Sequence, residues 1–177
     1  MRNTLLLCAA ALLGSANAFA AEVDVQWQDP EKFTDIRPAN DSRKAYRERV
    51  MKKFAGFFQE LSASLPEGFT WQVTVSDIDL AGDVDYFAGG AGSPLRVVKE
   101  IYSPAIKFSH VLRDQFGEQV VAGEEKLRDM GFMHSLRSIS KSEEFHYEKQ
   151  MLQDWFDKAL QPQLQQHAKA LPKISEG

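Results

Sequence analysis

The chain has 177 residues and a formal net charge of −4 at pH 7, from 21 Lys and Arg against 25 Asp and Glu. This is about the length of one domain, and its 44% hydrophobic and 26% charged residues are typical of a globular fold rather than a disordered chain. The acidic balance argues against nucleic-acid binding, which needs a clustered basic surface. The single cysteine, Cys8, argues against a disulfide framework or a cysteine-ligated zinc.

The first 20 residues have the pattern of a secretory signal peptide. An apolar run over residues 5–13 is too short to span a bilayer and is followed by small residues. Cleavage sites of the small-x-small type occur after Ala18 and after Ala20, and we expect the second to be used. The sequence therefore predicts a periplasmic protein that loses Cys8 with its signal peptide and has no transmembrane segment after cleavage.

The first elements of the predicted domain are a short strand and a long helix. Apolar and polar residues alternate from Val23 to Trp27, as in a strand. The helix is predicted to begin at Asn40 or Asp41 as N-cap and to end at the breaker cluster after Leu65. Its apolar stripe consists of Tyr46, Val50, Phe54, Phe57, Leu61 and Leu65.

Basic residues occupy most of the remaining surface of the first half of this helix. The simplest interpretation is a solvated face, and the alternative is a contact with an anionic partner. These residues are Arg43, Lys44, Arg47, Arg49, Lys52 and Lys53.

A second strand is predicted over residues 69–80, where a change of phase near Ser76 and Asp77 indicates a β-bulge. The segment from Tyr86 to Pro94 contains the run Gly89-Gly90-Ala91-Gly92 and is predicted to be a mobile loop. It lacks the lysine and Ser/Thr of a P-loop, so phosphate binding is not expected there.

An edge strand is predicted over residues 95–102, and a hairpin follows Pro104. Asp114-Gln115-Phe116-Gly117 suits a type I turn with a glycine bulge. This turn predicts the pairs Leu112 with Val120, His110 with Ala122, and Lys107 with Glu125.

A second amphipathic helix is predicted to start at Ser140 or Ser142 and to end at Pro162. We therefore expect one α+β domain over residues 21–161 and a polar, loosely held tail over residues 162–177. The predicted architecture is an antiparallel sheet of about four or five strands with two amphipathic helices packed on one face.

Four short sequence motifs occur in the same order in a bacterial family: DPEKFTD (29–35), LPEG (65–68), VSDIDLAG (75–82) and AGEEKLRDM (122–130), together with Pro104. By these motifs the chain resembles domain of unknown function 3016 (DUF3016), a family of exported proteins. The resemblance covers about residues 23–132. This resemblance implies a periplasmic α+β protein of proteobacterial type and implies no activity. The family usually has a second proline beside Pro104, where this chain has Ser103, a difference that bears only on the local turn.

The densest group of carboxylates lies at the end of the second predicted strand. Asp77, Asp79, Asp83 and Asp85 could supply oxygen ligands to Ca²⁺ or Mg²⁺, but their spacing and the position of Gly82 do not fit an EF-hand loop. We favour a solvated strand end whose aspartates form turns, and we expect neither a metal nor a cofactor.

A second candidate site pairs His110 with Glu124, which the predicted register places one diagonal step apart on the apolar face. Such a pair can perform acid-base chemistry. The alternative is that His110 is a core residue with satisfied hydrogen bonds.

No convincing nucleophile motif is present, because Ser138-Ile139-Ser140-Lys141 fits Ser-x-x-Lys without its companion motifs. The leading hypothesis is a non-enzymatic periplasmic module that binds an envelope protein or a small ligand. The alternative is a small envelope hydrolase or metal-dependent enzyme that uses the Asp or His/Glu group.

Overall fold

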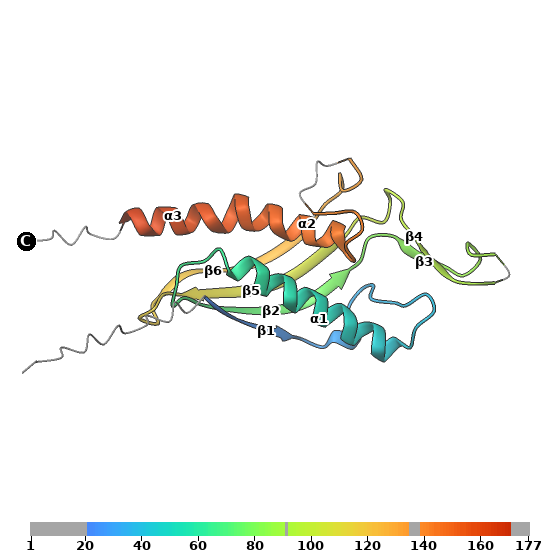
Figure 1. Cartoon of the computed structure of the whole chain (residues 1–177), viewed down its shortest axis with the longest axis horizontal. Coiled ribbons are helices and arrows are strands. Elements are labelled where there is room, and N and C mark those ends of the chain that lie inside the picture. Colours follow the sequence, from blue (N-terminus) through green and yellow to red (C-terminus); the bar gives the residue numbers. More distant parts are fainter. Residues whose placement is uncertain (1–20, 91, 135–138, 171–177) are drawn as a thin grey trace, which may run out of the picture.

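A computed structural model describes residues 21–90, 92–134 and 139–170 of the protein. The predicted signal peptide over residues 1–20 lies outside these residues. A four-stranded sheet with helices on one face and a separate two-stranded sheet give an α+β fold, as predicted (Figure 1). The elements are β1 (Glu22–Trp27), a 3₁₀ turn (Pro30–Lys32), α1 (Arg43–Ser62), β2 (Thr70–Asp79), β3 (Asp83–Asp85), β4 (Leu95–Val97), β5 (Ala105–Arg113), β6 (Gln119–Arg128), α2 (His146–Trp155), a π-helical turn (Phe156–Leu160) and α3 (Gln161–Ala170).

The main sheet is mixed: the expectation of an antiparallel sheet holds for the pairs β2–β5 and β5–β6, and the pair β1–β2 departs from it. Its strand order is β1-β2-β5-β6, and β1 runs parallel to β2 while the other pairs are antiparallel. The chain passes through α1 between β1 and β2, the kind of crossover that parallel neighbours require. The alternation of apolar and polar residues within a strand does not show whether the neighbouring strand runs parallel or antiparallel to it. The sequence pattern therefore could not predict the parallel pairing of β1 with β2.

The predicted bulge in β2 is confirmed, because the pairing of β2 with β5 shifts between Val75 and Asp77. The turn after β5 is also confirmed: the N–H of Asp114 donates to the carbonyl oxygen of Glu118 at 2.9 Å, and Gly117 has a φ of 82°. The predicted register beyond this turn is wrong by one residue. An extra residue in β6 shifts the pairing, so that Leu112 lies opposite Val121.

The predicted edge strand over residues 95–102 is not part of the main sheet. Only Leu95–Val97 is extended, and it pairs with Asp83–Asp85 in the two-stranded sheet. These strands form an arm that projects from the body of the protein (Figure 1). We call the described residues 83–90 and 92–97 the β3–β4 arm.

Helix α1 begins slightly later than predicted. Its N-cap is Ser42, whose Oγ accepts a hydrogen bond from the N–H of Ala45 at 3.1 Å. Asn40, one of the two expected caps, instead donates from Nδ2 to the carbonyl oxygen of Pro94 at 3.0 Å, which ties the start of the helix to the β3–β4 arm.

The C-terminal helix continues past Pro162, which corrects the predicted end at this proline. The N–H of Gln161 donates to the carbonyl oxygen of Phe156, five residues earlier, so the helix is widened by a π turn just before the proline. Proline lacks an N–H and clashes with the preceding turn of an α-helix, and the wider turn accommodates it. Residues 162–170 are therefore helical, and Leu164 packs against the core.

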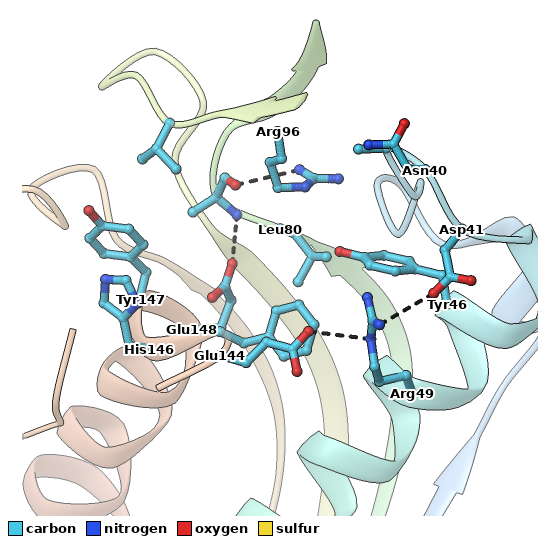
Figure 2. Close-up of a pocket in the computed structure, with 14 residues that line it drawn as sticks. Asn40, Asp41, Tyr46, Arg49, Leu80, Arg96, Glu144, His146, Tyr147 and Glu148 are labelled. Atoms are coloured by element: carbon cyan, nitrogen blue, oxygen red, sulfur yellow. Dashed lines mark hydrogen bonds and ion pairs between the residues drawn. The ribbon is translucent and has the colours of Figure 1, made fainter. Parts of the chain in front are cut away.

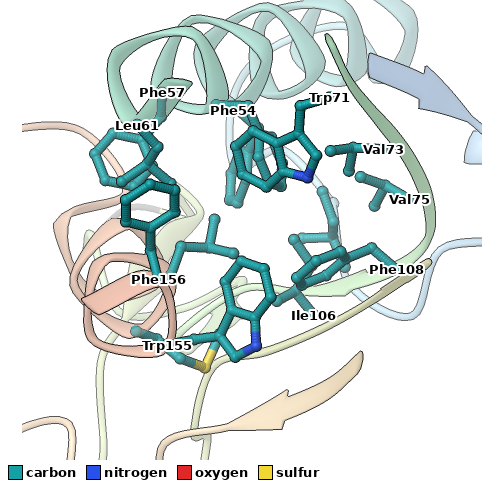
Figure 3. Close-up of a cluster of buried hydrophobic side chains, with 14 of the residues drawn as sticks. Phe54, Phe57, Leu61, Trp71, Val73, Val75, Ile106, Phe108, Trp155 and Phe156 are labelled. Atoms are coloured by element: carbon teal, nitrogen blue, oxygen red, sulfur yellow. The ribbon is translucent and has the colours of Figure 1, made fainter. Parts of the chain in front are cut away.

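Aromatic side chains fill the layer between the sheet and the helices (Figure 3). Phe58 of α1 contacts Trp71 and Phe108 edge-on, with ring centroids 5.5 and 5.8 Å apart. Trp155 of α2 contacts Phe108 edge-on at 4.9 Å. These contacts place α1 and α2 on the same face of the sheet, as predicted. None of the helices in the described part of the chain combines the length and the hydrophobicity that a transmembrane span requires.

Candidate functional site

A cleft of about 530 Å³ brings together residues from several segments of the protein (Figure 2). It lies where the first turns of α1, the end of β2, the base of the β3–β4 arm and the start of α2 meet. We call it the α1–α2 cleft. Its residues are Ala39, Asn40, Asp41, Tyr46, Arg49, Leu80, Ala81, Arg96, Val98, Glu144, Phe145, His146, Tyr147 and Glu148.

One wall of the cleft is held in place by Arg96. Its guanidinium donates to Asp35 Oδ2 at 2.9 Å, and to the carbonyl oxygens of Gly82 and Arg37, also at 2.9 Å. Burial raises the pKa of Asp35, but the hydrogen bonds and charge of Arg96 outweigh burial and hold this pKa below its ordinary value. Arg96 therefore joins the arm, the end of β2 and the loop before α1 into one rigid wall.

The opposite side of the cleft is fixed by Glu148, which is only 2% exposed. Its Oε1 accepts a hydrogen bond from the backbone N–H of Ala81 at 2.6 Å. Glu148 lies in the first turn of α2, where the helix dipole favours a carboxylate. This bond anchors the start of α2 to the end of β2.

Charged groups lie at the mouth of the cleft around Arg49. Its guanidinium is 3.3 Å from Asp41 Oδ2 and 3.3 Å from Glu144 Oε1, and it sits 5.0 Å from the centre of the Tyr46 ring. These three charged side chains are between a third and a half exposed. They can exchange their mutual ion pairs for contacts with a polar ligand at modest cost, because exposed pairs contribute little stability.

The aromatic part of the lining comes from α1 and the start of α2. Phe145 contacts Tyr46 edge-on, with ring centroids 6.5 Å apart, and Phe54 at 5.8 Å. Burial raises the pKa of Tyr46, so this residue presents a neutral phenol. Phe145 is the N-cap of α2 and has a φ of 59°, an unfavourable conformation for a residue with a large side chain. Such local strain is common at binding sites.

The four aspartates of the predicted cation site do not converge on one point. Asp77 accepts hydrogen bonds from the N–H of Thr34 at 2.7 Å and from Lys107 Nζ at 2.8 Å. Asp85 accepts from the N–H of Phe87 at 2.9 Å and forms a turn.

Asp79 and Asp83 do lie at one shallow depression of about 230 Å³, but each faces an arginine. Arg128 is 3.1 Å from Asp79 and Arg37 is 2.9 Å from Asp83. Across the described ranges, no three His, Cys, Asp or Glu side chains are grouped so that they could hold a metal ion.

The predicted approach of Glu124 to His110 is wrong because the register is shifted by one residue. Glu124 lies opposite Ser109 and is exposed, whereas Glu125 is on the same face as His110, with 3.5 Å between Oε1 and the imidazole Nε2. His110 itself lies opposite Gly123, where any side chain would come within 3.3 Å of the imidazole.

His110 is 3% exposed and is packed among aromatic rings. The ring centroid of Trp155 is 5.2 Å away and that of Trp71 is 6.4 Å away. Burial lowers the pKa of His110 more than Glu125 raises it, so the imidazole is neutral. Its Nδ1 has no hydrogen-bond partner among the described residues. His110 thus lies in the core, away from the α1–α2 cleft.

Sequence reasoning missed the α1–α2 cleft because its residues come from four distant segments. Arg96 and Glu148 carried no motif, and each has its role only through long-range contacts. The one available signal was the glycine-rich segment before Arg96, which indicated a departure from regular structure.

Comparison with known proteins gives a family and no closer relative. No curated protein and no solved structure matches the chain at a significant level. A family model described as "Protein of unknown function (DUF3016)" matches residues 21–158, which is most of the chain. The protein therefore belongs to the DUF3016 family.

Proposed function

We propose that the protein is an exported, periplasmic binding module without catalytic activity, and that the α1–α2 cleft holds a small amphipathic ligand. The observation that carries this proposal is the cleft itself, which brings aromatic and charged side chains from four segments around one space of about 530 Å³. Small-molecule sites commonly have volumes of about 300–1,000 Å³ and combine an apolar lining with a few polar groups.

The lining suggests the class of ligand. Phe145 and Tyr147 can stack on a planar or apolar body, while Arg49 and Glu144 at the mouth offer one group of each charge. We therefore expect a small molecule with an apolar body and a charged or zwitterionic end.

The competing hypothesis of a hydrolase needs convergent catalytic groups. Asp77 and Asp79 are neutralised by Lys107 and Arg128, and His110 is enclosed by aromatic rings. This dispersal of the candidate groups favours the binding module.

Two features support export. The first 20 residues have the sequence pattern of a signal peptide, and the family match begins at residue 21, immediately after the expected cleavage site. Cell fractionation followed by mass spectrometry of the intact protein tests this proposal. We expect a periplasmic species that begins at Ala21, and a cytoplasmic species with its first 20 residues intact would contradict it.

The binding proposal is tested by native mass spectrometry of the purified protein after incubation with periplasmic metabolites. Replacing Val98, which lines the cleft, with Trp should abolish any bound mass because the larger ring fills the space. Val111→Trp, on the opposite face of the sheet, is the matched control and should retain it. Equal binding by both variants would place the ligand elsewhere, and absence of any bound species in all three proteins would contradict the proposal.

A further inference from the structure

The end of the β3–β4 arm exposes apolar side chains. Phe87 is 84% exposed, Tyr86 is 54% exposed and Leu95 is 46% exposed. Tyr86 and Phe87 directly follow β3, and Leu95 is the first residue of β4, where it pairs with Asp85, so the three residues lie close together at the far end of the paired strands. We call them the arm tip. Apolar side chains grouped on a projection indicate a contact surface, unlike single exposed residues scattered over a protein.

The segment from Tyr86 to Leu95, which carries the arm tip, has no charged residue between Asp85 and Arg96. The nearest carboxylates belong to Asp85, which caps the backbone at Phe87, and to Asp83, which pairs with Arg37. Insertion of the arm tip into an apolar environment would therefore require no desolvation of a charge within it.

Basic side chains gather at the same end of the molecule. Arg37, Arg43 and Arg47 line one small depression, together with a single carboxylate from Glu31. Within the described residues, no carboxylate forms an ion pair with Arg43 or Arg47, and Arg43 is exposed.

This basic group is attached to the arm by direct contacts. Arg37 binds Asp83 at 2.9 Å, and Asn40, three residues before α1, binds the carbonyl oxygen of Pro94 beside the arm tip. The run of Lys and Arg in the first half of α1 thus lies beside an uncharged apolar projection. Arg37 is paired with Asp35 and Asp83, and Lys44 lies 4.0 Å from Glu48, so among the described residues the basic groups here without an acidic partner are Arg43 and Arg47.

We propose that the arm tip and the basic residues Arg43, Lys44 and Arg47 together dock the protein on an anionic phospholipid surface. The apolar side chains enter the boundary between headgroups and acyl chains, and the guanidinium and ammonium groups contact lipid phosphates. Peripheral proteins need both kinds of contact, because apolar insertion and electrostatic attraction are each weak alone. The charge complementarity favours a lipid surface over a purely apolar groove of another protein. This inference does not depend on the α1–α2 cleft.

Vesicle co-sedimentation of the purified protein tests the proposal. The probes are vesicles of phosphatidylglycerol mixed with phosphatidylcholine and vesicles of phosphatidylcholine alone. We expect binding to the mixed vesicles, about tenfold weaker binding to the neutral ones, and loss of binding as salt is raised, because screening weakens the contacts of the basic residues. Equal binding to both vesicles, or to neither, would overturn the proposal.

Matched variants distinguish binding through this specific docking surface from nonspecific binding of the protein to vesicles. Phe87→Ser should weaken vesicle binding by about tenfold or more, because it removes the most exposed apolar side chain of the arm tip. Phe116→Ser is the control: Phe116 is 80% exposed, in the β5–β6 turn at the other end of the sheet (Figure 1). Arg43→Glu with Arg47→Glu should also abolish binding, whereas Lys126→Glu with Lys169→Glu, at exposed sites elsewhere, should not.

A direct measurement of insertion complements the binding assay. The added tryptophan fluorescence of Phe87→Trp should be quenched by lipids brominated on their acyl chains, whereas that of Phe116→Trp should not. Circular dichroism of each variant verifies its fold. If Phe87→Ser and Phe116→Ser weaken binding equally, or if Phe87→Ser instead disrupts an association between copies of the protein without affecting vesicles, the arm tip is not a lipid contact.

Discussion

Glu148 accepts a hydrogen bond at 2.6 Å from the backbone N–H of Ala81, 67 residues earlier in the chain. This bond connects the first turn of α2 with the end of β2, and it forms one side of the α1–α2 cleft. Both partners are buried, Ala81 at 4% exposure and Glu148 at 2%. Their pairing therefore links the stability of the fold to the shape of the cleft.

Replacement of Glu148 with Ala should lower the free energy of unfolding by about 2 kcal/mol, because the buried N–H of Ala81 then lacks an acceptor. Glu148→Gln should lose less than half as much, since the amide oxygen can still accept this hydrogen bond. Urea unfolding measures both. Glu60→Ala, at an exposed position of α1, is the control and should change stability by less than about 0.5 kcal/mol. Equal losses for the Ala and Gln variants would show that the hydrogen bond is not responsible.

The pairing of Arg96 with Asp35 predicts a pH dependence. Because the pKa of Asp35 is lower in the folded protein than its ordinary value, the unfolded chain binds a proton more readily. This group therefore contributes stability above about pH 4, and the contribution is lost as pH falls through the folded-state pKa. Arg96→Ala should raise the pKa of Asp35 and lower the free energy of unfolding by about 3 kcal/mol at pH 7.

Carboxyl NMR titration of Asp35 and urea unfolding at several pH values check this prediction. The destabilisation caused by Arg96→Ala should shrink at acid pH, where Asp35 is protonated in the parent protein as well. Lys52→Ala, at an exposed position of α1, provides the control. An unchanged pKa of Asp35 in the Arg96 variant would contradict the role assigned to this ion pair.

His110 predicts a second, separate pH dependence. Burial lowers its pKa in the folded protein, whereas in the unfolded chain the pKa is near 6.5. Between these two values the unfolded chain binds the additional proton, so the free energy of unfolding falls as pH drops below about 6.5. His110→Phe removes the titrating group and should flatten this part of the profile without a loss of stability at pH 5. A parallel profile for the two proteins, measured by urea unfolding, would refute the assignment to His110.

Leu164 tests the extension of the C-terminal helix beyond Pro162. Its side chain is partly buried against the core, so Leu164→Ala should lower the free energy of unfolding by about 1–2 kcal/mol. Gln165→Ala, at the neighbouring exposed position, should have almost no effect. If thermal or urea unfolding shows no difference between these variants, α3 does not contribute to the folded core.

Local signals in the sequence determined the elements that depend on neighbouring residues. The stripe of α1, the phase change at Asp77 and the turn from Asp114 to Gly117 follow from side-chain periodicity and turn chemistry, which act over a few residues. Four separated sequence motifs in the same order also indicated the DUF3016 family, and the family match over residues 21–158 confirms this prediction.

Tertiary structure alone decided the features that depend on distant partners. One extra residue in β6 brought Glu125 rather than Glu124 to His110, and a π turn allowed the helix to continue through Pro162. The α1–α2 cleft and the basic end beside the arm tip arise because long-range contacts of Arg96 and Asn40 bring separate segments together. Residue patterns report local conformation and burial, whereas a site requires the relative placement of whole elements, which is decided when the core packs.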